Sequence, residues 1–153
     1  MVTKKVKKEK ISKKKLMDEN IEIAKLIAKA RDKYTCQHCG VKATGLKMHG
    51  SHVINEARDH RLACDPYNIK ALCYNCHINW WHKNPVEAGE WFRKKRPGRW
   101  EQLQKAHIAY MKIGSISITW ALARNEELRE DAEAYHINLS KFTYGAKWLQ
   151  KLK

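Results

Sequence analysis

Two CxxC pairs constrain the fold of this chain more than any other feature. Cys36 and Cys39 form the first pair, Cys73 and Cys76 form the second, and the long segment 40–72 separates them. Four thiolates from two such turns can surround one Zn²⁺ ion tetrahedrally. We therefore predict a closed tetrathiolate site that holds a structural Zn²⁺ and brings the two turns together. Reduced core cysteines or a redox CxxC pair are the alternative.

The cysteine usage also bears on the compartment. Five cysteines in a reducing environment favour a metal site over disulfides, and Cys64, which belongs to neither pair, is expected to be a small buried hydrophobe. The N-terminus is charged and lacks the apolar stretch of a secretory signal, and no apolar run approaches the roughly 18 residues that span a bilayer. We expect an intracellular protein without a membrane partner, in the host cytoplasm if it is phage-encoded.

The chain carries a formal net charge of +15, and much of this charge lies at its start. Residues 1–15 hold eight lysines against a single acid, Glu9, and have almost nothing to bury. Such a segment is expected to be disordered when free and attracted to polyanions, with a solubilising or localising tail as the plainer alternative. Because the rest of the chain is also basic, binding to a phosphate backbone is favoured.

The apolar pattern predicts a small α+β domain. We expect a basic tail over 1–15, a zinc-held core with flanking helices over 16–112 and a C-terminal helical extension over 113–153. A strand is predicted at 46–54 and a polar loop at 55–67. Helices are predicted at 16–33, 73–83, 84–95, from about 100 to before Gly114, at 119–135 and at 141–152. Asn84, Pro85 and Glu87 form a strong helix start, with Asn84 as the cap and Glu87 completing a capping box.

Residues 48–54 (MHGSHVI) and 68–77 (NIKALCYNCH) carry a family resemblance. They resemble the motif of HNH (ββα-metal) endonucleases, in which a histidine ends a strand, an asparagine lies in a loop and a His or Asn follows CxxC. More loosely, the chain is similar to phage recombination nucleases of the NinG (Rap) type, which share the CxxCH…NP continuation. The resemblance implies a ββα-metal core held by the tetrathiolate zinc site and surrounded by helices.

The motif positions are His52, Asn68 and His77, and phosphodiester hydrolysis explains two of them. An imidazole with a pKa near 6.5 can take a proton from water, so His52 is the candidate general base. A divalent cation can stabilise the departing oxygen, so His77 is the candidate ligand for a catalytic Mg²⁺ or Mn²⁺, although other divalent ions would serve. By resemblance, Asn68 tethers the loop and orients the base. An ordinary turn asparagine and ordinary core or surface histidines are the alternatives.

One position departs from the family pattern. Many HNH enzymes place a metal-binding Asp or His just before the base, but this chain has Ser51 there. His49 is a replacement ligand only if a bulge at Gly50 redirects it, because side chains alternate along a strand. His82 is a further candidate, although it lies about 140° from His77 around an α-helix.

Several other residues stay open. Asp59, His60 and Asp65 lie in the polar loop as further candidate ligands. Trp80 and Trp81 follow the metal histidine and would either stack on bases or, as we favour, pack against the zinc turns. The predicted phosphate track consists of Arg58, Arg61, Arg93, Lys94, Lys95, Arg96 and Arg99, with a plain solvated face as the alternative.

The sequence thus predicts a metal-dependent endonuclease that acts on DNA, with branched or single-stranded-flanked substrates preferred because no base-reading helix stands out. A homing or restriction-type HNH nuclease on duplex DNA is the alternative within the enzyme class. A non-catalytic zinc module that binds nucleic acid is the alternative outside it, and an RNA-directed nuclease is a third. A homodimer would suit an enzyme that makes two cuts at a junction.

Overall fold

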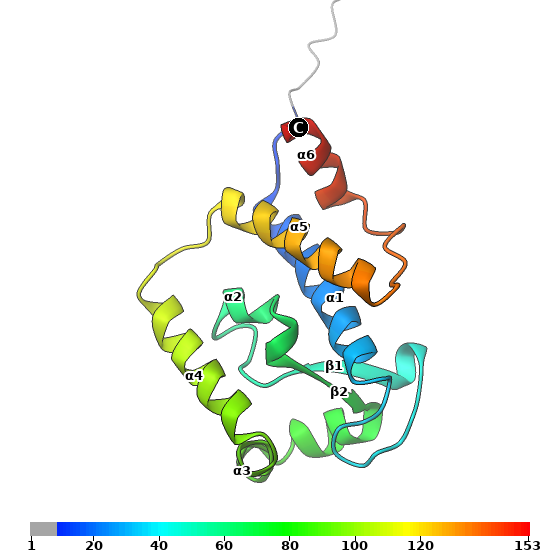
Figure 1. Cartoon of the computed structure of the whole chain (residues 1–153). Coiled ribbons are helices and arrows are strands. Elements are labelled where there is room, and N and C mark those ends of the chain that lie inside the picture. Colours follow the sequence, from blue (N-terminus) through cyan, green and yellow to red (C-terminus); the bar gives the residue numbers. More distant parts are fainter. Residues whose placement is uncertain (1–8) are drawn as a thin grey trace, which may run out of the picture.

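The structure, a computed structural model, describes residues 9–153 and places a two-stranded sheet among helices (Figure 1). The elements follow in the order α1 (Lys13–Arg31), η1 (Gly45–Lys47), β1 (Met48–His52), α2 (His60–Ala63), η2 (Pro66–Asn68), β2 (Ile69–Cys73), η3 (Asn75–Trp81), α3 (Pro85–Lys95), α4 (Pro97–Met111), α5 (Ile118–Ala134) and α6 (Tyr144–Leu152). The predicted α+β class is confirmed. Among the described residues, no helix has the length and apolar character needed to cross a membrane.

The sheet pairs β1 antiparallel to β2 in a regular register that runs from Met48 opposite Cys73 to His52 opposite Ile69. The bulge considered at Gly50 is therefore not found in β1. Gly50 is needed for another reason: an added Cβ would lie 2.8 Å from Cβ and Cγ of Lys25. The glycine thus allows α1 to lie directly against the strand that carries His52.

The helices cover the two faces of the sheet differently. On one side α1 crosses the sheet, and α5 runs beside α1, as Figure 1 shows in blue and orange. The apolar faces of α1 and α5 share one buried cluster with the loop and β2, formed by Ile23, Ala24, Ile27, Ala28, Cys64, Ile69, Leu128 and Ala132. The C-terminal extension predicted at 113–153 therefore completes the hydrophobic core of the segment that precedes it.

The other side of the sheet is covered by η3, α3 and α4. Phe92 of α3 and Leu103 of α4 are each 1% exposed and pack with Ile54 and Leu62 in a second cluster. The two helices meet at Pro97, which occupies the first turn of α4. The expected helix start near Trp100 is wrong by one turn, because proline at the first helical position loses no backbone hydrogen bond.

Two further expectations are corrected at helix starts. The tail predicted to end at residue 15 gives way to α1 at Lys13, because Ser12 Oγ accepts a hydrogen bond from Lys15 N and Leu16 is buried; residues 1–8 lie outside the described part of the chain. The capping box at α3 does not form. Asn84 makes no side-chain cap, and the Glu87 carboxylate accepts a hydrogen bond from Trp80 Nε1 instead.

Candidate functional site

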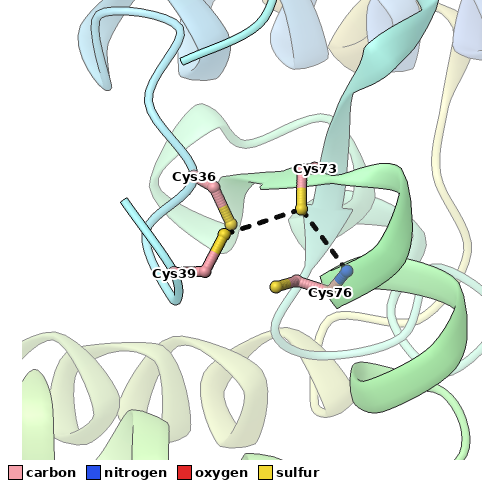
Figure 2. A group of neighbouring side chains, drawn as sticks. All are labelled: Cys36, Cys39, Cys73 and Cys76. Atoms are coloured by element: carbon pink, nitrogen blue, oxygen red, sulfur yellow. Dashed lines mark hydrogen bonds between the residues drawn. The ribbon is translucent and has the colours of Figure 1, made fainter. Parts of the chain in front are cut away.

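The four paired cysteines converge as their spacing predicted (Figure 2). Cys36 and Cys39 lie in the loop after α1, Cys73 ends β2, and Cys76 lies in the first turn of η3. Their sulfurs all lie within 4.8 Å of one another, and this group could hold a metal ion. Sulfurs bonded tetrahedrally at about 2.3 Å would be about 3.8 Å apart. The Sγ atoms of Cys39 and Cys73 are 3.8 Å apart, so the residues fit such an ion.

Hydrogen bonds favour the thiolate of Cys36, whereas the pKa of the Cys39 thiol is raised and burial raises that of Cys76. Burial opposes the charge on Cys36, but backbone N–H groups, first those of Cys39 and Cys73, lower the pKa of its thiol to about 7. The Nδ1 atom of His38 lies 3.3 Å from Sγ of Cys76, and the N–H of Cys76 donates to Sγ of Cys73. The fifth cysteine, Cys64, is fully buried elsewhere, and burial raises the pKa of its thiol to about 12. Its expected role as a small buried side chain is confirmed.

A cleft of about 650 Å³ lies beside the cysteine cluster. It is bordered by α1, β1, the loop after β1, η3 and α3, and its lining includes His52, His77 and His82. The rings of the predicted base and of the predicted metal ligand thus face one shared space. The same cleft is lined by Lys25 and Glu56, which the sequence pattern did not single out.

His52 is held so that one ring nitrogen stays free. Its Nε2 lies 2.8 Å from the carbonyl oxygen of Ala63 and donates to it, which leaves Nδ1 as the unprotonated nitrogen of the neutral ring. Nδ1 lies 3.7 Å from the Glu56 carboxylate, at the cleft. Burial lowers the pKa of His52, while the Ala63 carbonyl and Glu56 act in the opposite direction. The ring is therefore neutral near pH 7 and has an acceptor nitrogen available.

The metal-ligand candidates His77 and His82 are brought together by a π-helix. Segment η3 has i→i+5 bonding, with the N–H of His82 donating to the carbonyl of His77. This wider turn places Nε2 of His82 2.9 Å from Nε2 of His77. The helix predicted over 73–83 is present over Asn75–Trp81 as a π-helix, so the angular separation of the two rings calculated for an α-helix is wrong. Single-turn π-helical segments are rare and often lie at functional sites.

A third histidine fixes the ring of His77. Nε2 of His49 donates to the carbonyl of Leu46 at 3.1 Å, so Nδ1 of His49 is an acceptor. It lies 2.8 Å from Nδ1 of His77, which must then be the donor. Nε2 of His77 is left with a lone pair that faces His82. Burial, followed by the charges of His82 and His49, lowers the pKa of His77 to about 3, so its ring is neutral.

The spacing of the two facing nitrogens suits metal coordination. Neighbouring ligands of an octahedral ion bonded at about 2.1 Å are about 3 Å apart, which matches the 2.9 Å between the Nε2 atoms of His77 and His82. Nδ1 of His77 faces His49 and its Nε2 faces His82. The three rings therefore cannot all coordinate one ion. His49 thus lies where a supporting residue of a metal ligand lies, hydrogen-bonded to the nitrogen that stays off the metal.

Asn68 is fully buried behind the loop that follows β1. Its Oδ1 accepts from the N–H of Ile54, and its Nδ2 donates to the carbonyls of Ile54 and Leu62, all between 2.8 and 3.0 Å. Two of these bonds reach Ile54, in the loop after His52, and the third reaches Leu62 of α2, whose Ala63 carbonyl holds the His52 ring. Asn68 thereby fixes the backbone on both sides of that contact.

The remaining ligand candidates do not line the cleft. Ser51 is fully buried beside Lys70, whose Nζ lies 3.4 Å from its Oγ. Asp59 caps α2 and lies 2.7 Å from Nδ1 of His107, and Asp65 caps η2. His60 is exposed on a separate surface. Asp59 and Asp65 cap short helices, and His60 lies on another surface. The three residues are therefore not retained as metal-ligand candidates.

The predicted phosphate track divides into buried and exposed parts. Arg61 is only 8% exposed and donates to the carbonyls of Gly114 and Ser115. Its assignment to the phosphate track is therefore wrong. Arg99 is half-buried and donates to the carbonyls of Tyr67 and Ile69. The exposed members are Arg58, Arg93, Lys94, Lys95 and Arg96. Their distribution makes the face near the end of α3 strongly positive.

The two tryptophans pack close to the cysteine cluster. The Trp80 ring stacks on His38 with ring centroids 3.6 Å apart, and Trp81 lies beneath Nζ of Lys70 at 3.1 Å. The favoured interpretation as packing residues therefore agrees with their surroundings. The fully buried Lys70 carried no signal in the sequence, because a lysine in a strand is normally solvent-exposed.

Comparison with known proteins gave no match to this chain, whether with protein-family models, with curated proteins or with solved structures. The functional assignment therefore depends on the geometry of the site.

Proposed function

We propose that this chain is a metal-dependent endonuclease of the HNH (ββα-metal) type that hydrolyses phosphodiester bonds in DNA. The observation that carries the proposal is the shared cleft, which a neutral histidine with a free acceptor nitrogen and a pair of facing imidazoles line together. General-base and metal chemistry would act on the same phosphate there. The positive charge of the chain, +15 in total, suits a polyanionic substrate.

In this mechanism each residue has one task. Nδ1 of His52 takes the proton from the attacking water, and the Glu56 carboxylate at 3.7 Å stabilises the imidazolium that results. His77 and His82 would hold a divalent cation, Mg²⁺ or Mn²⁺, which would supply stabilisation of the charge on the scissile phosphate and the departing oxygen. His49 orients His77 through the 2.8 Å contact of their Nδ1 atoms. Asn68 holds the backbone that positions His52.

The cysteine cluster has a separate role in the proposal. A tetrathiolate site is coordinatively closed, so a Zn²⁺ ion bound by Cys36, Cys39, Cys73 and Cys76 would be structural. It would join the loop after α1 to the junction of β2 and η3, which carries His77. A zinc ion there would fix the segment that carries His77 without touching the substrate.

A cleavage assay tests the proposal directly. Purified protein is incubated with supercoiled plasmid, a four-way junction and a flap, with Mg²⁺, Mn²⁺ or no added metal. We expect metal-dependent nicking that His52→Ala reduces by about 100-fold or more, because general-base catalysis contributes about 10²–10⁴-fold. The matched control is His60→Ala, since His60 is an exposed histidine outside the cleft.

The outcomes separate the alternatives. Equal nicking by His52→Ala and the wild type would contradict the proposal, provided that both melt at the same temperature. DNA binding without cleavage under any metal would favour a non-catalytic zinc module. Preferred cutting of the junction and the flap would support an enzyme of the phage recombination type, whereas preferred cutting of linear duplex at one sequence would support a homing or restriction type.

A further inference from the structure

A second cavity lies on the side of the cysteine cluster that faces the end of α3. Its volume is about 210 Å³, and its polar lining consists of Gln37, His38, Lys70, Lys95, Arg96 and Arg99. Four of these side chains are basic and none is acidic. The volume is below the roughly 300–1,000 Å³ of typical small-molecule sites. The cavity therefore suits a small anionic group better than a whole nucleoside.

Lys70 is a buried basic residue in the lining of this cavity. The side chain is 1% exposed, and its hydrogen bonds to Ser51 Oγ and to the His52 carbonyl are long, at 3.4 and 3.5 Å. Within residues 9–153 no carboxylate forms an ion pair with it. Burial, and then the charge of Arg99, holds the pKa of Lys70 well below its usual range. A buried ammonium without a counter-ion is unfavourable, and an anion in the cavity would offset that cost.

The two arginines have donors available at the cavity. Arg99 uses Nε and Nη2 to hold the carbonyls of Tyr67 and Ile69, each at 2.7 Å, and its guanidinium has five N–H groups in all. Arg96 makes one long contact, 3.4 Å, with Oε1 of Gln37. The nearest acid that acts on Arg99, Asp32, is already paired with the guanidinium of Arg31.

The start of α4 adds to the positive potential. Arg96 is the N-cap residue of α4, Pro97 occupies the first helical position and Arg99 lies in the first turn, which has neither a side-chain cap nor an acidic residue. The free backbone N–H groups and the dipole of this 15-residue helix favour an anion at that end. The cavity thus combines fixed cations, a buried amine and a helix terminus.

We propose that this cavity binds a phosphate group of a polynucleotide strand, at a position separate from the scissile phosphate. The inference rests on the proposed function only for the identity of the strand. Trp81 connects the two sites, because it lines the cleft and its ring lies 3.1 Å from Nζ of Lys70, which lines the cavity. A phosphate held here would fix the register of the strand that passes the cleft.

The salt dependence of DNA binding tests the assignment without using cleavage. Binding of a fluorescent duplex is measured by anisotropy at several salt concentrations, with no added divalent metal. Each phosphate contact contributes about 0.9 to the slope of log K against log salt, so Arg96→Gln is expected to lower the slope by about one. The matched control is Lys105→Gln in α4, since Lys105 lies outside the cavity and forms an exposed ion pair with Glu101. Equal reductions by both variants would overturn the proposal.

Nuclear magnetic resonance gives a direct second readout. The indole N–H of Trp91, which lines the cavity, is expected to shift saturably when a short oligonucleotide is added, and Arg96→Gln should remove the shift. The buried indole of Trp148 in α6 serves as the internal control. A shift with inorganic phosphate but none with the oligonucleotide would overturn the polynucleotide assignment, and no saturable shift with either would overturn the site. Neither readout involves hydrolysis. The phosphate site can therefore be supported or rejected even if the protein proves to have no nuclease activity.

Discussion

Nε2 of His52 donates a hydrogen bond of 2.8 Å to the carbonyl of Ala63, which lies beyond the loop that follows β1. This contact selects the tautomer in which Nδ1 is the basic nitrogen. It also shows that the backbone of α2 determines which nitrogen of the ring carries the proton.

The first prediction concerns the pH dependence of cleavage. Burial lowers the pKa of His52 below the ordinary histidine value of about 6.5. The unprotonated, basic form of the ring is therefore still present at pH 6.5. The acid limb of the rate profile should therefore lie below pH 6.5. Because Glu56 raises the pKa of His52, Glu56→Gln should move that limb to still lower pH. A limb above 6.5, or a shift upward in the variant, would contradict His52 as the base.

The second prediction concerns His49, which contacts the candidate metal ligand His77. His49→Ala removes the acceptor for Nδ1–H of His77, and loss of such supporting contacts typically weakens metal binding by about 10–100-fold. Titration of Mn²⁺ by calorimetry measures the affinity. His49→Gln, which retains an acceptor, should be less impaired, and His60→Ala should bind as the wild type does. Unchanged affinity in His49→Ala would show that His77 is oriented by other means.

The third prediction concerns the cysteine cluster. Cys73→Ser should open the tetrathiolate site and unfold the core, because structural zinc contributes folding free energy directly. The matched control is Cys64→Ala, a fully buried cysteine outside the cluster, which we expect to lower the free energy of unfolding by only about 1 kcal/mol. Thermal melting with measured zinc content checks both variants. Equal melting temperatures for Cys73→Ser and the wild type would refute a structural metal.

The fourth prediction concerns Asn68. Its replacement by alanine leaves the Ile54 N–H and the carbonyls of Ile54 and Leu62 buried without their partner. An unsatisfied buried polar group costs about 1–3 kcal/mol, so we expect Asn68→Ala to lower the free energy of unfolding by about 3 kcal/mol. Asn55→Ala, in the exposed part of the same loop, is the control, and urea denaturation is the measurement. A loss no larger than that of the control would remove the structural role of Asn68.

Local signals in the sequence predicted a large part of the fold. The predicted helix at 84–95 agrees with α3, which begins at Pro85 and ends at Lys95, and the helices predicted at 16–33 and 119–135 differ from α1 and α5 by a few residues at their ends. The cysteine spacing predicted the convergence of two turns that lie far apart in the chain. These features depend on neighbouring residues or on a fixed coordination geometry, and both can be inferred from one sequence.

Features that depend on distant partners could not be predicted. Arg61 donates to the carbonyls of Gly114 and Ser115, which follow α4 and lie more than fifty residues away in the sequence. The sequence showed only its positive charge, which suggested a phosphate contact. Lys70 is buried because Trp81 and the helices α3 and α4 cover its strand. The polar composition of residues 55–67 concealed α2, a single turn whose start depends on the Asp59 side chain.

The π-helical turn changes what a pair of histidines five residues apart signifies. An α-helix juxtaposes side chains at i and i+4, so a search for paired imidazoles by that interval passes over this chain. Widening the turn by one residue restores the pairing at an interval of five. Removal of one residue between positions 77 and 82 would thus allow ordinary α-helical winding to align the same two rings.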